Sequence, residues 1–148
     1  MKEKMKVRAL RGLLCVGGFL YFVFLAFLLT GVGAFCGVLC RNILGSEEFA
    51  KEIVEWSLVI PWCSLACFLF FWMLGFLTSS ESRKETKTLF CSDEDISLYL
   101  KKGMMSLLMK RIKDGVFGMV LCLVCGMLII VAAAAVSYCV FHIRVCFI

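Results

Sequence analysis

The sequence has little of what soluble, disordered or nucleic-acid-binding proteins require. It contains one proline and very few asparagines or glutamines, which argues against long disordered or low-complexity linkers. Charged residues make up only 18% of the 148 residues. Hydrophobic residues make up 62%, well above the roughly 45–50% that is usual for soluble globular proteins. We therefore expect lipid to be the solvent around much of the chain.

Three stretches contain no Asp, Glu, Lys, Arg or His, and they run over 12–40, 56–80 and 115–141. Each exceeds the roughly 20 residues that a helix needs to cross a bilayer, which offers no water to unpaired backbone groups. The sequence predicts an all-α integral membrane protein that forms a single membrane domain over 1–148. We expect transmembrane helices over 13–39, 57–78 and 116–141, an outer loop over 41–56 and a cytosolic loop over 79–115.

Basic residues are distributed unequally between the two sides that this topology defines. Lys and Arg number 5 before residue 12 and 8 in the loop 79–115, but 2 in the loop 41–56 and 1 after residue 141. Because basic residues near the ends of spans stay on the cytoplasmic side, we expect a cytosolic N-terminus and an outside C-terminus in the plasma membrane. Acidic residues accompany the basic ones, so no segment is typical of nucleic-acid binding. The first apolar run is about twice the 7–15 residues of a secretory signal, which favours an uncleaved anchor over a cleaved signal.

The two loops carry helix-start signals. Ser46 followed by Glu47 and Glu48 predicts a helix that begins outside and continues into the second span. Glu48, Glu52 and Glu55 share one side of it, which we interpret as a solvated face, with cation binding as the alternative. In the cytosolic loop, residues 79–88 read as flexible, and Ser92 predicts the cap of a helix that extends through Ile112.

This second loop helix is predicted to lie in the membrane interface and to turn into the third span at Gly115 and Gly118. Binding to a calmodulin-like partner is the alternative. Basic residues that would reach anionic headgroups are Lys101, Lys102, Lys110, Arg111 and Lys113.

Small residues recur at helical spacing within the spans. Gly33 and Gly37 form a Gly-x-x-x-Gly pair in the first span, and Gly118, Cys122 and Gly126 line one side of the third. Such residues let helix backbones approach closely in lipid. We favour packing within the chain, with homo-oligomerisation as the alternative.

Ten cysteines raise the question of redox or metal chemistry. Cys122 and Cys125 form a Cys-x-x-Cys pair, but it lies inside the third span, where a thiolate would be desolvated. We interpret these cysteines as packing residues. With one histidine, a mixed Cys and His zinc site is implausible. An outer disulfide from Cys40 to Cys139 or Cys146 is compatible with the topology, as is acylation of Cys15 or Cys91.

The stretch from Leu89 to Ile96, followed by Leu98, Leu100, Lys101, Lys102 and Gly103, resembles the cytosolic segment of a family of small bacterial membrane proteins of unknown function. That resemblance implies a bacterial inner membrane and no known activity. The family usually has four spans, whereas Lys110, Arg111 and Lys113 interrupt this chain where the family's third span would run.

No acidic or basic side chain lies within a predicted span, although proton relays and ion pathways need such groups. No Walker loop or dinucleotide fingerprint occurs either. We therefore expect no enzyme and no cofactor, but a non-catalytic accessory, regulatory or scaffold component whose partners are the lipid bilayer and a membrane protein or a second copy. The alternatives are a self-associating pore or small transporter and, more weakly, a membrane thiol oxidoreductase that uses Cys122 and Cys125.

Overall fold

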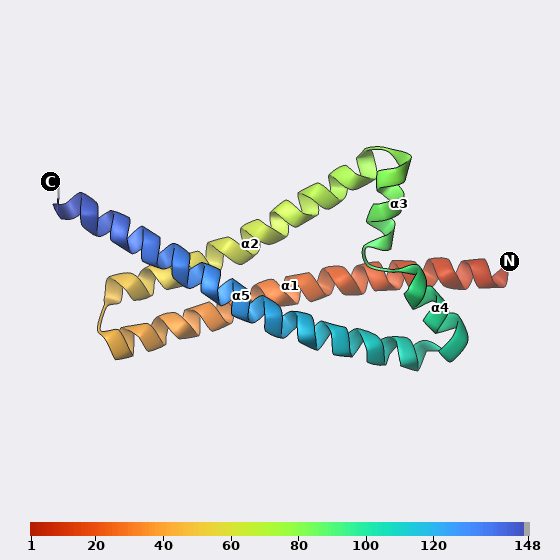
Figure 1. The fold of residues 1–148 in the computed structure, drawn as a ribbon, viewed down its shortest axis with the longest axis horizontal. Helices are drawn as coiled ribbons and strands as arrows, with labels where there is room; N and C mark the ends of the chain where they lie inside the picture. Colours follow the sequence, from red (N-terminus) through yellow and green to blue (C-terminus); the bar gives the residue numbers. More distant parts are fainter. Residues whose placement is uncertain (147–148) are drawn as a thin grey trace. The chain divides into compact units, whose positions relative to one another are not determined.

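The protein is all-helical in the computed structural model, which describes residues 1–146. No strand forms among these residues, so the predicted all-α class is confirmed. The helices follow one another in the order traced in Figure 1: α1 (Lys2–Leu44), α2 (Glu47–Leu77), α3 (Ser80–Thr88), α4 (Asp93–Lys102) and α5 (Met104–Cys146). Three of them, α1, α2 and α5, are long and apolar enough to cross a membrane.

The predicted spans 13–39 and 116–141 lie inside α1 and α5, which extend beyond their apolar runs at both ends. The predicted span 57–78 overruns the end of α2 at Leu77 by one residue, although α2 begins well before its apolar run. The outer loop shrinks to the connection Gly45–Ser46 because α1 continues to Leu44. As predicted, the second long helix begins just after Ser46. The Ser46 hydroxyl accepts a hydrogen bond from the Phe49 amide at 3.4 Å, which satisfies one amide left open in the first turn.

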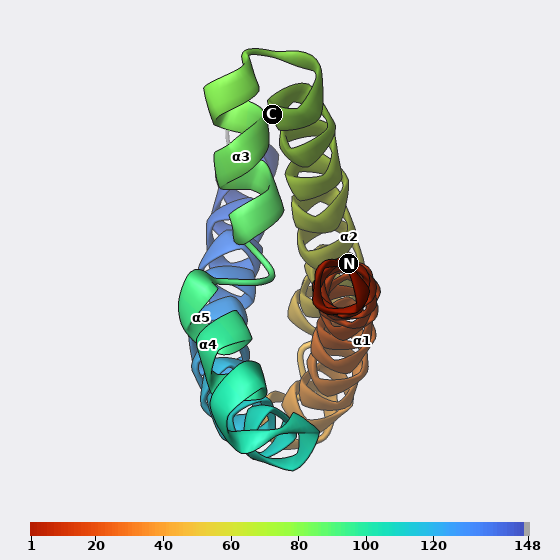
Figure 2. The ribbon, with the colours of Figure 1, turned by 90° about the vertical axis from the view of Figure 1, so that its right-hand side faces the viewer.

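The segment 79–88, which we expected to be flexible, instead forms the helix α3. Ser79 caps it by accepting a hydrogen bond from the Ser82 amide, and the Arg83 side chain donates to the Phe76 carbonyl oxygen at 3.1 Å. Figure 2 shows α3 turning back beside the C-terminal end of α2. Thr86 lies against Gly75 there, where a side chain on the glycine would collide with it.

The turn before the third long helix lies at Gly103, so the expected hinge at Gly115 and Gly118 is wrong. Gly103 has a φ of 84°, a conformation that other residues rarely adopt, and its amide donates to the Tyr99 carbonyl oxygen at 3.0 Å. Glycines are tolerated inside membrane helices, so Gly115 and Gly118 leave α5 unbroken.

The chain forms two compact units. Unit 1 comprises Met1–Val23 and Ala66–Gly118, and it buries Leu10, Phe90 and Leu107. Unit 2 comprises Phe24–Leu65 and the chain from Met119 onwards. Its core consists of Ile53, Ile130 and Ala134. The helices α1, α2 and α5 each continue from one unit into the other.

Candidate functional site

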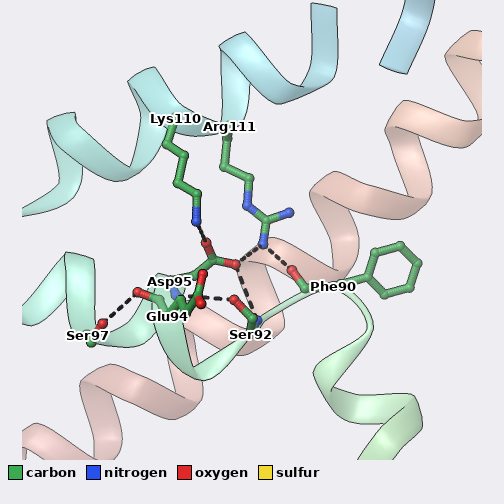
Figure 3. A network of polar contacts seen from close by, with 7 residues as sticks. All are labelled: Phe90, Ser92, Glu94, Asp95, Ser97, Lys110 and Arg111. Carbon is green, nitrogen blue, oxygen red and sulfur yellow. Dashed lines mark hydrogen bonds and ion pairs between the residues drawn. The ribbon is translucent and has the colours of Figure 1, made fainter. Parts of the chain in front are cut away.

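In unit 1, a buried carboxylate joins α4 to the start of α5. Asp95 has a side chain that is only 9% exposed. Its Oδ1 lies 3.1 Å from Lys110 Nζ, and its Oδ2 lies 2.8 Å from Arg111 Nη2 (Figure 3). Arg111 also donates to the Phe90 carbonyl oxygen, so one guanidinium ties α5 both to the carboxylate and to the backbone before α4.

The local sequence fixes Asp95 in place before either basic residue reaches it. Asp95 is the third residue of α4, and it completes a capping box with Ser92. The Asp95 amide donates to the Ser92 hydroxyl at 3.3 Å, and the Ser92 amide donates to Asp95 Oδ2 at 3.2 Å. The same carboxylate therefore caps the helix and anchors it to α5.

The electrostatics of this cluster favour the ionised carboxylate. Burial by itself would raise the pKa of Asp95, but the hydrogen bond from Lys110, the charge of Arg111 and the hydrogen bonds with Ser92 outweigh it and lower the pKa. Both carboxylate oxygens accept hydrogen bonds from basic side chains. An acid with a lowered pKa and occupied oxygens suits a structural anchor better than a general base.

Phe90 and Cys91, which immediately precede the cap of α4, are the buried part of the connection between α3 and α4. The Phe90 ring packs edge-on against Phe22, Phe68 and Trp72, and it lies against Gly18, where a side chain would collide with the ring. Burial raises the pKa of the Cys91 thiol. Because Cys91 is 1% exposed, it is a packing residue in this structure rather than an accessible nucleophile or acylation site.

The predicted basic surface divides into two groups. Lys110 and Arg111 point to Asp95, whereas Lys101, Lys102 and Lys113 are exposed. Sequence reasoning missed the cluster around Asp95. A usable signal was present, because Asp95 precedes Gly103 by eight residues and Arg111 follows it by eight, so a turn at the glycine brings the two charges level.

In unit 2, the predicted Gly-x-x-x-Gly pair of α1 faces α2. A side chain on Gly33 would collide with Ser57, and one on Gly37 would collide with Val54 and approach the Ala50 carbonyl oxygen. The lack of a side chain at both positions lets the two helices approach closely.

The predicted packing residues of α5 lie in both units. Gly126 lies against Leu29 of α1 in unit 2. Gly118 lies near Tyr21 in unit 1, where the Tyr21 hydroxyl also donates to the Gly115 carbonyl oxygen at 2.5 Å. Cys122 is half-buried, and Cys125 is exposed.

Two polar side chains inside the apolar runs, Thr30 and Ser57, bond to helix backbone. The Thr30 hydroxyl lies 2.9 Å from the Ala26 carbonyl oxygen and 3.2 Å from that of Ser57. The fully buried Ser57 donates from its own hydroxyl to the Val54 carbonyl oxygen at 2.8 Å. These hydroxyls are engaged in helix contacts, which leaves them poorly placed to line a water-filled path.

Polar side chains of unit 2 near the connection between α1 and α2 form two pairs. Arg41 binds Glu47 at 2.7 Å across the connection Gly45–Ser46. His142 Nε2 lies 3.9 Å from Glu48, and the His142 ring packs edge-on against Tyr138. Within residues 1–146, no group of three or more His, Cys, Asp or Glu side chains is arranged to hold a metal ion. All ten cysteines are unbridged, including Cys40, Cys139 and Cys146.

A shallow apolar groove of about 600 Å³ also lies in unit 2, between α2 and α5. Trp56 is its only lining residue from α2 among those identified, and the others belong to α5. The lining residues are Trp56, Ile129, Ala132, Ala133, Val136, Ser137 and Val140.

Comparison of the chain with family models, with curated proteins and with solved structures yields no match.

Proposed function

We propose that this chain is a non-catalytic membrane protein that crosses the bilayer three times and acts by packing against another membrane component, as an accessory, regulatory or scaffold subunit. The observation that carries the proposal is the engagement of Thr30 and Ser57. Both residues lie in the apolar runs, and their hydroxyls bond to helix carbonyl oxygens. The buried carboxylate of Asp95 lies outside those runs, and basic side chains neutralise its charge.

The proposal includes a plasma-membrane location with a cytosolic N-terminus, which the distribution of basic residues supports. The resemblance of the segment around Leu89–Ile96 favours a bacterial inner membrane. We place α4 at the cytosolic interface, where Lys101 and Lys102 extend from its C-terminal end towards anionic headgroups. Lys110 and Arg111 contribute differently, because they hold α4 to α5 through Asp95.

A flux measurement tests this function. Purified protein is reconstituted into liposomes that contain a fluorescent ion indicator, with a pore-forming peptide as the positive control. We expect the vesicles to stay as tight as protein-free ones. Ion flux that rises with the amount of protein would instead support the alternative of a self-associating pore or small transporter.

The weaker alternative, a membrane thiol oxidoreductase, predicts a different result. It predicts that the thiols of Cys122 and Cys125 exchange with the disulfide of an oxidised probe peptide, and that replacing both cysteines with Ala abolishes this exchange. We expect no thiol exchange in the original protein, because both cysteines lie within the third apolar run, where a thiolate would be desolvated.

Topology is tested by labelling intact cells with a membrane-impermeant reagent. Single cysteines introduced at Glu48 and at Lys84 should differ, with only the one at position 48 labelled from outside. Equal labelling of the two positions would contradict the proposed orientation.

A further inference from the structure

One exposed face of α5 in unit 2 carries a regular repeat, part of which lines the groove beside Trp56 of α2. Exposed residues recur there at alternating intervals of four and three, which is the 3.5-residue period of a left-handed helix pair. We call this set the α5 seam. Its members are Cys125, Ile129, Ala132, Val136, Cys139, Ile143 and Cys146.

The α5 seam differs from an ordinary lipid-facing surface in the regular alternation of its residue types. One heptad position holds only small residues, namely Cys125, Ala132, Cys139 and Cys146, and the other holds only β-branched residues, namely Ile129, Val136 and Ile143. Small residues allow close approach of backbones in lipid, and β-branched residues at one core position favour parallel two-stranded pairing. The buried residues Ile130 and Ala134 lie on the other side of the helix, so intramolecular packing does not explain the repeat.

Extending our proposed function, we propose that the membrane component that packs on the α5 seam is a second copy of this chain. Two copies inserted in one membrane have the same orientation, so their α5 helices run parallel, and each seam residue faces its own counterpart across a two-fold axis. The seam is self-complementary in this arrangement, because the β-branched residues of one copy enter the spaces beside the small residues of the other.

The available area is sufficient for a specific pair. Ile129, Val136 and Ile143 are 56%, 65% and 56% exposed, respectively. Each of these side chains leaves on the order of 100 Å² uncovered, judging from the area that such residues bury in protein cores. Full burial of these three side chains in both copies covers roughly 600 Å², and full burial of the four small seam residues brings the total to roughly 1,000 Å², the lower bound for a specific interface. The groove beside Ala132 and Val136 adds a hollow that a partner side chain can fill.

Thiol crosslinking in membranes that contain the full chain tests the pair. One variant keeps Cys139 as its only cysteine, and its matched control keeps only Cys63, which is also exposed in unit 2 but lies on α2. With a short bismaleimide, which joins two thiols without oxidation, we expect about tenfold more dimer from Cys139 than from Cys63. Equal yields, or none from Cys139, would overturn the proposal.

A second pair of variants locates the contact within the seam. Ala132→Leu in the Cys139 background should lower the dimer yield about fivefold, because the larger side chain separates the backbones. The control Val124→Leu adds bulk at an exposed position outside the seam and should leave the yield unchanged. If both variants give the yield of the parent, the seam is not the contact.

Crosslinking and flux separate the two proposals. Tight vesicles without a Cys139 dimer would remove the second copy as the partner while retaining the accessory function. Leaky vesicles would overturn the accessory function itself, whatever the crosslinking result.

Discussion

Unit 1 and unit 2 stabilise their helix contacts by different means. In unit 1, Asp95 binds two basic side chains, and Phe90 inserts its ring among other aromatic rings. In unit 2, the helices approach closely at Gly33 and Gly37 and enclose a small aliphatic core, and the ion pairs, such as Arg41–Glu47, involve exposed side chains. The difference follows from the surroundings that we assign to each region, because charged groups are costly in lipid, whereas small residues pack well there. Unit 1 should therefore respond to pH, and unit 2 to side-chain size.

The largest effect is expected in unit 2. Gly33→Val places a branched side chain where Ser57 already lies, so the helices must separate. We expect a loss of about 3 kcal/mol in the free energy of unfolding, measured by detergent titration in mixed micelles. The matched control is Gly31→Val in the same helix, because a side chain on Gly31 meets nothing within 4 Å. Similar losses from both variants would mean that α1 tolerates no β-branched residue here and that contact with Ser57 is irrelevant.

In unit 1, the largest single effect should come from Asp95→Asn. The substitution leaves Lys110 and Arg111 beside a neutral amide, and because both are more than one-third exposed, water compensates in part. We expect a loss of about 2 kcal/mol, and faster maleimide labelling of the buried Cys91 as α4 detaches. Asp93→Asn is the control, because that side chain is 90% exposed and lies 3.8 Å from Arg11. If Asp93→Asn exposes Cys91 as much as Asp95→Asn does, Asp95 is not the anchor.

The pH dependence of unit 1 should arise from the same carboxylate. The folded-state pKa of Asp95 is lowered, so its stabilising contribution is complete above the unfolded value of about 3.9 and is lost as the pH falls through the folded-state pKa. Hydrogen exchange of the α4 amides, corrected for intrinsic rates, should therefore accelerate only below about pH 4. Asp95→Asn should remove this dependence. If exchange of the α4 amides still accelerates at low pH in Asp95→Asn, the pH dependence arises from another group.

The sequence predicts the helices and where they begin better than it predicts the contacts between residues far apart in the chain. Uncharged runs identify the three long helices, because no other backbone arrangement is compatible with lipid at that length. Ser46 and Ser92 mark helix starts correctly, since a capping interaction involves only neighbouring residues. Gly33 and Gly37 were recognised as packing positions, although their neighbours, Ser57 and Val54, are known only from the structure.

The errors concern breaks and partners. The sequence predicts the turn at Gly115 and Gly118, whereas the chain turns at Gly103, because glycine permits a positive φ without requiring one. A turn at Gly115 would leave Lys110 and Arg111 on the membrane surface. The reversal at Gly103 instead brings both side chains to Asp95. Residues 79–88 lack apolar periodicity, so nothing in their sequence predicts that α3 would pack against the end of α2.

The smallest effect that still separates the units concerns their two glycine turns. Gly45 and Gly103 are the glycines with positive φ in residues 1–146, at 66° and 84°. The Gly45 amide donates to the Arg41 carbonyl oxygen at the end of α1. Asn also adopts the left-handed conformation at this position after a helix, so Gly45→Asn should cost only a few tenths of a kcal/mol. Gly103 combines its φ with a ψ of −178°, a region open essentially to glycine alone, so Gly103→Asn should cost about 1 kcal/mol or more. Unfolding measurements on the two variants check this. A loss at Gly45 as large as that at Gly103 would show that the turn at Gly45 is as tightly constrained as the turn that brings Lys110 and Arg111 to Asp95.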